Sequence, residues 1–188
     1  MRAARHLRIP YLQLTVLDTR RLTPRELVLL KSVFGSAVDY ALVRLQKGGW
    51  LTWRGQAVAW ANRVRFPADR FRNDFTTGHL GDAVWLVHEL CHVWQWQNVD
   101  GYYPLKAARE HLSGTSPYLY TLDPDKKLLD YGWEQQAKIV EDWTRRCIQG
   151  DSPEQLADYT RVIRTAIPAP EWAPPAEAWA SIRAENIA

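Results

Sequence analysis

The spacing of apolar residues predicts three helices whose ends carry capping signals. Residues 23–26 (Thr-Pro-Arg-Glu) combine a capping hydroxyl, a proline at the first helical position and a glutamate at the third. Apolar residues then follow at helical spacing up to Gly35. A second amphipathic helix is predicted over about 127–148, before Gly150. The Ser-Pro-Glu-Gln sequence within 152–167 repeats the first capping pattern and predicts the last main helix.

Alternation of apolar and other residues predicts strands in the N-terminal half of the chain. The segment 37–45 places Val38, Tyr40 and Leu42 on one side of an extended chain, and 57–66 alternates in a similar way. Helices together with a small sheet indicate the α+β class.

The run 82–97 contains no glycine or proline and is predicted to be helical, with Asp82 as its cap. An apolar stripe and an aromatic stripe leave this helix with little polar surface, which indicates a central, buried position. The run contains residues 88–92 (His-Glu-Leu-Cys-His), so two histidines lie within a helix that is otherwise suited to a core.

On a helix, His88 and His92 lie one turn apart on the same face, and their imidazoles can converge on one metal ion. Glu89 is rotated by about 100° from His88, so it can reach a metal-bound water without being a ligand, as a zinc hydrolase requires. The alternative is a pair of core histidines bonded to neighbouring groups, since a buried polar group without a partner costs about 1–3 kcal/mol.

A catalytic zinc ion usually takes three protein ligands and keeps one position for water, so two histidines require a third donor. Glu110 and His111 follow His92 at a spacing near that of many zinc peptidases with a glutamate ligand. Glu134 lies in the predicted helix 127–148, where a rigid element would hold a carboxylate firmly. An ordinary exposed helix carboxylate is the other interpretation of Glu134.

The length of 188 residues suits one domain with a substantial core. No apolar run approaches membrane-spanning length. The basic N-terminus is interrupted by Pro10 and has no long apolar core, which argues against a signal peptide and predicts a cytoplasmic protein at synthesis. Cys91 and Cys147 are too few for a disulfide scaffold and are interpreted as reduced thiols, with a bridge between them as the alternative.

The net charge is only +3, but the first 73 residues are basic and the remainder is acidic. We interpret this asymmetry as attraction between two halves of one domain. A basic face for nucleic acid is the alternative, and the absence of an accompanying recognition motif argues against it.

The motif and its surroundings resemble a known family. Residues 88–95 (His-Glu-Leu-Cys-His-Val-Trp-Gln) are similar to the His-Glu-(Leu/Met)-Thr-His-Val-(Val/Trp)-Gln signature of the zincin-like family that includes the extracellular contractile injection system core domain. Cys91 replaces the usual threonine. The likeness extends to 22–35, 38–40 and 129–137, and it is nearest to members found beside bacterial Rhs and Vgr secretion proteins.

The resemblance covers about 22–143 and implies a gluzincin-like metallopeptidase fold. This fold is α+β and mostly helical, with a small sheet in the N-terminal half and an active-site helix that carries His-Glu-x-x-His. The resemblance also implies that Glu134 is the third ligand beside His88 and His92. One domain, 1–188, then comprises an N-terminal helix and small sheet (22–80), metal-binding helices (81–167) and a proline-rich tail (168–188).

The implied function is a Zn²⁺-dependent peptidase that acts on a peptide or protein substrate, with Glu89 as the general base. The resemblance also implies a Rhs- or Vgr-type secretion partner, with export by a dedicated machine. The alternative is a non-catalytic zinc-binding module with a structural or adaptor role in a secretion system.

The sequence leaves two further roles at such a site unassigned: the residue that orients a ligand histidine and the donor to the oxyanion. Asp130, Glu141 or Asp142 can orient a ligand imidazole through its second nitrogen, and the resemblance favours Asp142. A donor to the developing oxyanion is also needed. The available candidates are Tyr103, His111, Tyr120 and Tyr131.

Overall fold

The structure is a computed structural model that describes most of the chain. The predicted candidates Tyr103, Glu110 and His111 lie outside the described residues, as does most of the predicted tail, 168–188. The described residues are 18–48, 52, 55–99, 116–169 and 182.

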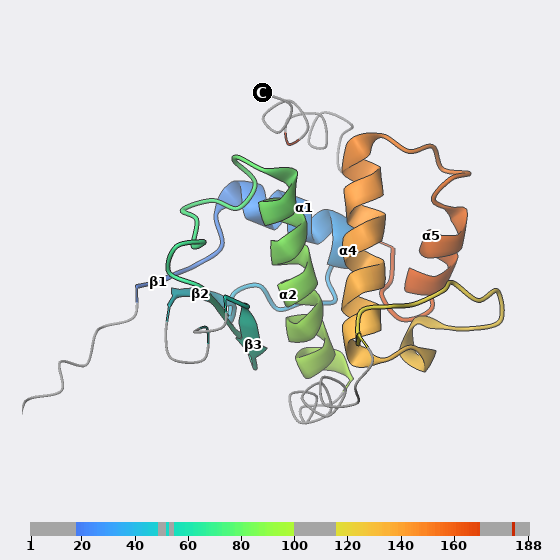
Figure 1. Ribbon diagram of the computed structural model, residues 1–188, viewed down its shortest axis with the longest axis horizontal. Coiled ribbons are helices and arrows are strands. Elements are labelled where there is room, and N and C mark those ends of the chain that lie inside the picture. Colours follow the sequence, from blue (N-terminus) through green and yellow to red (C-terminus); the bar gives the residue numbers. More distant parts are fainter. Residues whose placement is uncertain (1–17, 49–51, 53–54, 100–115, 170–181, 183–188) are drawn as a thin grey trace, which may run out of the picture.

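Two long helices, α2 (Leu80–Asn98) and α4 (Trp133–Gln149), stand side by side at the centre of the molecule (Figure 1). The strands lie on one side of α2, and the short helix α5 (Ala157–Ile163) lies beside α4 (Figure 1). The described residues thus form helices and one small four-stranded sheet, which confirms the α+β class predicted from the sequence.

Helix α1 (Pro24–Phe34) forms as predicted. The hydroxyl of Thr23 accepts a hydrogen bond from the backbone N–H of Glu26, and the Glu26 carboxylate accepts one from the backbone N–H of Thr23. This is the reciprocal capping box that residues 23–26 predicted. Gly35 follows with a φ of 55°, a left-handed value that glycine adopts readily, and ends the helix.

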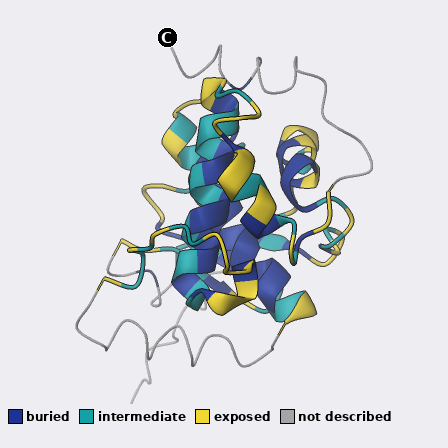
Figure 2. Ribbon diagram, turned by 90° about the vertical axis from the view of Figure 1, so that its right-hand side faces the viewer, coloured by how far each residue is buried: buried dark blue, intermediate teal, exposed yellow. Residues whose placement is uncertain are grey.

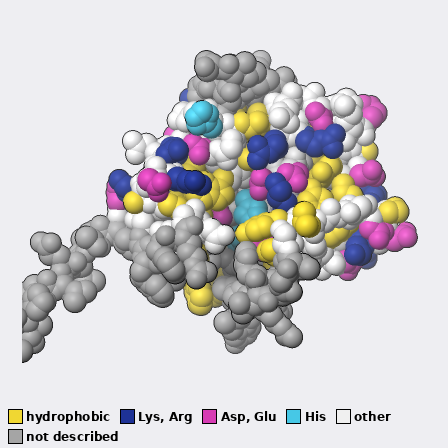
Figure 3. Space-filling model, viewed as in Figure 1, with side chains coloured by type: hydrophobic (Ala, Val, Ile, Leu, Met, Phe, Trp, Pro, Cys, Tyr) yellow, Lys and Arg dark blue, Asp and Glu magenta, His cyan; other side chains and the backbone are white. Residues whose placement is uncertain are grey.

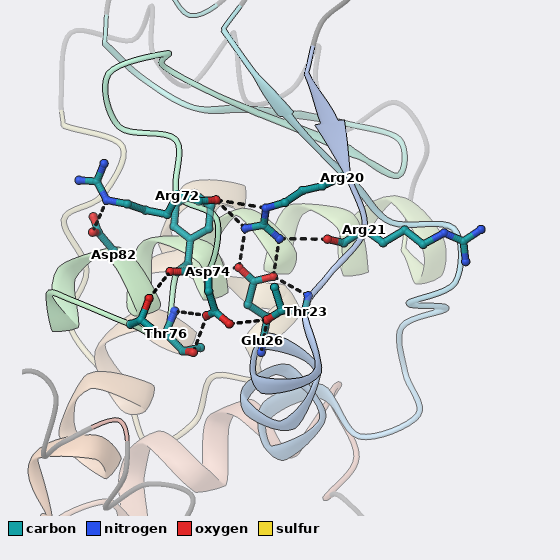
Figure 4. Close-up of polar contacts among 10 residues, drawn as sticks. Arg20, Arg21, Thr23, Glu26, Arg72, Asp74, Thr76 and Asp82 are labelled. Atoms are coloured by element: carbon teal, nitrogen blue, oxygen red, sulfur yellow. Dashed lines mark hydrogen bonds and ion pairs between the residues drawn. The ribbon is translucent and has the colours of Figure 1, made fainter.

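The carboxylate of Glu26 is fully buried and joins α1 to the segment that leads into α2 (Figure 4). Arg20 donates two hydrogen bonds of 2.7 Å to this carboxylate, and the backbone N–H of Phe75 donates a third at 2.9 Å. Arg20 also donates to the carbonyl oxygen of Arg72, whose own guanidinium pairs with Asp82 of α2 at 2.8 Å. One buried charge therefore fixes the approach to the central helix.

The sheet has the strand order β1-β2-β4-β3. Strand β1 (Thr19–Arg20) is antiparallel to β2 (Arg44–Lys47), and β2 is parallel to β4 (Arg63–Phe66). Strand β3 (Val58–Trp60) pairs antiparallel with β4. Both β3 and β4 pack against α2. The residues that the sheet buries in the core are Leu45, Ala59, Val64 and Phe66.

Two strand predictions are wrong in their bounds. The predicted strand 37–45 begins only with β2, because the Asp39 carboxylate accepts a bond from the backbone N–H of Ala41 and holds the preceding residues in a turn. The predicted strand 57–66 is in fact two strands that reverse direction around Ala61, whose φ is 52°. Alternation of residue types does not reveal so short a turn when neither turn residue is glycine.

Helix α2 is enclosed along most of its length, as its lack of a polar face predicts. In Figure 2, buried residues, drawn in dark blue, occupy much of the central helices. The helix begins at Leu80 rather than at Asp82, because the Asp82 carboxylate binds Arg72 and does not cap the helix. The sheet covers one part of the α2 surface and α4 covers another.

The predicted helix 127–148 is divided by an extended residue. A single 3-10 turn, η2 (Leu128–Asp130), precedes Tyr131, and α4 starts only after Gly132. The side-chain oxygen of Gln135 accepts a hydrogen bond from the backbone N–H of Gly132 and marks the true start of the helix. Gly150, with a φ of 96°, ends α4 as predicted.

The last main helix is shorter than predicted. Ser152 and Gln155 exchange the bonds of a capping box, but they do so within a turn, and α5 begins only at Ala157. A local capping pattern therefore forms without continuing directly into a helix.

Cys91 and Cys147 are free thiols in the structure. Burial raises the pKa of both, that of Cys147 to about 12, so neither thiol has thiolate character near neutral pH. Among the described residues, no helix combines the length and apolar character needed to cross a membrane.

Replacement of Glu26 by glutamine tests the junction between α1 and α2. The variant leaves the Arg20 guanidinium without its anionic partner in a mostly buried position, so we expect Glu26→Gln to lower the free energy of unfolding by about 2–3 kcal/mol in urea denaturation. Asp158→Asn, at an exposed position in α5, is the control and should change it by less than about 0.5 kcal/mol. Equal losses in the two variants would contradict a role for the buried charge.

Candidate metal centre

The antiparallel helices α2 and α4 bring the three predicted ligands together. His88 lies near Glu141 and Glu134 of α4, while His92, one turn further along α2, also lies near Glu134. The two imidazole rings are 5.0 Å apart between centroids and stand nearly perpendicular, at 82°. Both rings therefore face α4 from one side of α2, as the spacing of His88 and His92 predicts.

The separations between these side chains fit a single metal ion. The potential ligand atoms of His88, His92 and Glu134 all lie within 4.8 Å of one another. Glu134 Oε2 is 3.3 Å from His88 Nε2 and 3.4 Å from His92 Nε2. Two ligands bonded at about 2.0–2.1 Å to a tetrahedral ion stand roughly 3.4 Å apart, so both separations match the edges of such a site.

The cluster is buried and rich in carboxylates. Burial lowers the pKa of His88, but the adjacent carboxylates of Glu134 and Glu141 outweigh this effect and raise it to about 10. Burial raises the pKa of Glu134, yet the charges and hydrogen bonds of His92 and His88 hold it well below its usual range. Carboxylates that converge on buried imidazoles in this way create a negative potential that attracts a cation.

Glu89 lies beside the cluster without belonging to the group of three. Its side chain is 5% exposed and is hydrogen-bonded by the side chain of Trp85. Burial raises the pKa of Glu89, and the nearby charges of His88 and His92 act in the opposite direction. The structure thus places Glu89 close to both histidines but outside the group of three, and its role as a general base stays a prediction.

Glu141, rather than Asp142, lies next to a ligand imidazole. Glu141 Oε2 is 3.2 Å from His88 Nδ1, an ion-pair distance without the alignment of a good hydrogen bond. Asp142 instead accepts bonds from Lys138 and from the hydroxyl of Tyr120. The preference for Asp142 was therefore wrong, because the two neighbouring residues point in directions about 100° apart on the helix.

Sequence reasoning missed a residue that contacts the second imidazole. Gln95 Oε1 lies 2.8 Å from His92 Nδ1, and the Gln95 side chain is fully buried. Gln95 is the last residue of the eight-residue signature, one turn beyond His92 and on the same face, so helical spacing alone contained a signal for this contact.

A tyrosine that was not among the predicted oxyanion donors lies near His88. The ring of Tyr118 is 6.0 Å from that of His88. Burial raises the pKa of Tyr118, and the charges of Glu134, Glu89 and Glu141 raise it further. The predicted donors Tyr120 and Tyr131 instead bond to Asp142 and to the backbone at Asp123, respectively.

Histidine atoms are visible on one face of the molecule (Figure 3), and a groove is formed mainly by the segment before α4. Figure 3 shows histidine atoms in a hollow near the middle of one face, with charged and hydrophobic side chains around it. A groove of about 740 Å³ is lined by 119–124, Lys126, Tyr131 and Gln135. Gln135 follows Glu134 in α4 and donates a hydrogen bond to the carbonyl oxygen of Leu119, which joins the groove wall to the first turn of the helix that carries Glu134.

Comparison with known proteins identifies relatives of this chain. The chain is 36% identical over 130 residues to the type VI secretion system spike protein VgrG2b of Pseudomonas aeruginosa. The match covers 66% of this chain and 13% of that protein. The solved effector domain of P. aeruginosa VgrG2b is 30% identical, with a TM-score of 0.64, over 79% of this chain and 83% of that domain. The chain belongs to the VgrG2b effector-domain family. No family model matches the chain.

Membership of the VgrG2b effector-domain family links the chain to type VI secretion and confirms the Vgr part of the resemblance seen in the sequence. The chain spans only 13% of the curated spike protein, so the relationship concerns the effector domain of VgrG2b and not the rest of the spike.

Removal of the carboxylate of Glu134 tests the cluster as a metal site. An ion that binds the folded state at about 100 times its Kd stabilises the protein by about 2.7 kcal/mol. We therefore expect Zn²⁺ to raise the melting temperature of the unmodified chain and to leave that of Glu134→Ala unchanged, with binding followed in parallel by calorimetry. Glu154→Ala, at an exposed position, is the control and should respond as the unmodified chain does. Stabilisation of Glu134→Ala by Zn²⁺ would place the ion elsewhere.

Proposed function

We propose that the chain is a zinc-dependent peptidase of gluzincin type that serves as an effector domain in type VI secretion. The observation that carries this proposal is the buried group of His88, His92 and Glu134 with Glu89 beside it. Two imidazoles and one carboxylate are the ligand set of a catalytic zinc site that retains one open position. Nitrogen and oxygen donors at these separations suit Zn²⁺ better than Mg²⁺ or Ca²⁺, which prefer oxygen ligands alone.

When bound, Zn²⁺ would supply Lewis acidity at the scissile carbonyl and lower the pKa of water to about 7. Glu89 would accept the proton that water loses as its oxygen attacks the carbonyl carbon. As the C–N bond breaks, Glu89 would return this proton to the departing amine. The second water proton stays on the new carboxylic acid and then passes to the amine, so the products are a carboxylate and an ammonium group, and Glu89 is regenerated.

Tyr118 is our candidate for the donor that stabilises the developing oxyanion. Its raised pKa keeps the hydroxyl protonated near neutral pH, as a hydrogen-bond donor must be. Its ring lies 6.0 Å from that of His88, and we propose that its hydroxyl reaches a substrate carbonyl at the metal position.

The groove formed mainly by the segment before α4 favours a peptide as the substrate. Its wall includes Leu119, Leu122, Pro124 and Tyr131, which offer apolar surface to side chains that flank a scissile bond. Leu119 is 73% exposed, more than any other large apolar side chain described, and stands directly after Tyr118. We propose that a chain bound at the metal continues along this groove.

A non-catalytic zinc module is the second candidate, and the low exposure of the cluster favours it. The residues His88, His92 and Glu134 are at most 7% exposed, so their ligand atoms are largely shielded from a substrate. In this interpretation the ion would lock α2 to α4 and the domain would act by binding a secretion partner.

The relation to VgrG2b also suggests how the domain reaches its target. A domain related to part of a spike protein would be made in the cytoplasm and exported with the secretion machine, either joined to a spike or bound to one. The substrate would then be a protein that the domain meets after export.

Glu89→Gln separates the two candidate functions. Loss of the general base should lower kcat for cleavage of a peptide library by about 10²–10⁴-fold, while the metal content stays at that of the unmodified chain. Gln97→Glu, at a half-buried position later in α2, controls for a change of charge on the helix. If the unmodified chain holds zinc yet cleaves nothing, and both proteins bind a spike partner equally, the structural module is the correct function.

Tyr118→Phe tests the oxyanion donor. The loss of one donor of this kind lowers kcat by about 10²–10³-fold, and we expect that loss with little change in KM or metal affinity. Tyr120→Phe removes a hydroxyl that bonds to Asp142 and Tyr159, away from the ligands, and should retain most of the activity. A similar kcat for the unmodified chain and Tyr118→Phe would exclude this role.

A further inference from the structure

A pair of buried amide side chains connects His92 to the first turn of α4. Gln95 of α2 and Gln136 of α4 are 0% and 3% exposed. Gln95 Nε2 donates to Gln136 Oε1 at 2.9 Å and to the carbonyl oxygen of Trp133 at 3.0 Å. Gln136 Nε2 donates in turn to the carbonyl oxygen of Tyr131 at 2.8 Å.

The direction of this chain of hydrogen bonds is determined by two backbone carbonyls. A carbonyl oxygen only accepts, so the Gln136 group that faces Tyr131 and the Gln95 group that faces Trp133 must both be NH₂. The Gln136 oxygen is then left for the Gln95 amide, and the Gln95 oxygen is left for His92 Nδ1. Neither amide can be turned over without setting an acceptor against an acceptor in a buried site.

An oxygen at 2.8 Å from His92 Nδ1 requires that this nitrogen carry the proton. The lone pair of the neutral ring is then on Nε2, the atom that lies 3.4 Å from Glu134 Oε2 and points toward the cluster. The other tautomer would place a proton on Nε2 and direct two lone pairs, those of Nδ1 and of the Gln95 oxygen, at each other.

The same amide also acts on the carboxylate ligand. Trp133, whose carbonyl oxygen accepts from Gln95, directly precedes Glu134 at the first position of α4. The hydrogen bond from Gln136 to the carbonyl oxygen of Tyr131 fixes this extended residue just before the start of α4. One fully buried side chain therefore sets the protonated nitrogen of His92 and the backbone position from which Glu134 reaches the cluster.

We infer that Gln95, braced by Gln136, is a positioning residue that prepares His92 and Glu134 for metal binding before the ion arrives. Its contacts go to one ligand ring and to the backbone at the other ligand, and its burial excludes water as a substitute. The inference rests on the metal centre proposed above, but it does not require that the domain cleave peptides.

The test uses Gln95→Met, which keeps the size of the side chain and removes its polar atoms. We expect zinc affinity, measured by competition with a chelating dye, to fall roughly 10- to 100-fold, as it does when other groups that orient a metal-bound histidine are removed. Gln97→Met is the matched control, because Gln97 lies on the same helix and makes side-chain bonds to Asp39 and Asn62 instead of the cluster. Its zinc affinity should match that of the unmodified chain.

A spectroscopic measurement complements the affinities, and its result for the unmodified, zinc-loaded chain does not depend on the folding of any variant. Long-range ¹H–¹⁵N correlation should show His92 with a proton on Nδ1 that exchanges slowly with solvent, and this slow exchange should be lost in Gln95→Met and kept in Gln97→Met. A proton on Nε2 of His92, or equal zinc affinity for Gln95→Met and the unmodified chain, would overturn the inference. Failure of the unmodified chain to bind zinc would overturn it together with the metal centre. Zinc binding without peptide cleavage would reject the peptidase alone.

Discussion

The contact between α2 and α4 is the constraint on which the rest of this structure depends, because it buries polar groups on both helices. His88, His92 and Gln95 lie on one side of α2, and each must find its partner on α4 or within α2. A core made only of apolar side chains would tolerate small shifts of one helix against the other. A buried set of donors and acceptors does not, since a shift leaves some of them without partners.

The structure around these helices is arranged to hold this contact in place. The sheet packs on another part of α2, and the capping box of α1 places Glu26 where it pairs with Arg20 and binds the segment before α2. On α4, Lys138 and Arg145 contact Glu141, whose other oxygen faces His88. Positive charges therefore stand behind Glu141, on the side away from His88, and the space between the imidazoles and Glu134 is the candidate place for a cation.

Local rules predicted those parts of the fold that depend on local interactions. The capping box of α1, the burial of α2 and the common face of His88 and His92 follow from spacing along a single helix. The contact with Glu134 joins two helices that are distant in sequence, so it was reached through family resemblance, and spacing left Glu110 and His111 open. The predicted bounds of the strands were wrong near Asp39, whose side chain bonds to the backbone in a turn, and at Ala61, whose left-handed conformation reverses the chain. Tyr118 was missed because its position depends on a segment without regular structure.

All three candidate ligands lie on α2 and α4, while the described wall of the groove comes mainly from the segment between these helices. Insertions, deletions or substitutions in that segment can reshape the surface that meets another molecule and leave the coordination geometry as it is. Surface recognition and metal coordination therefore depend on different parts of the chain. The two properties can diverge independently during evolution.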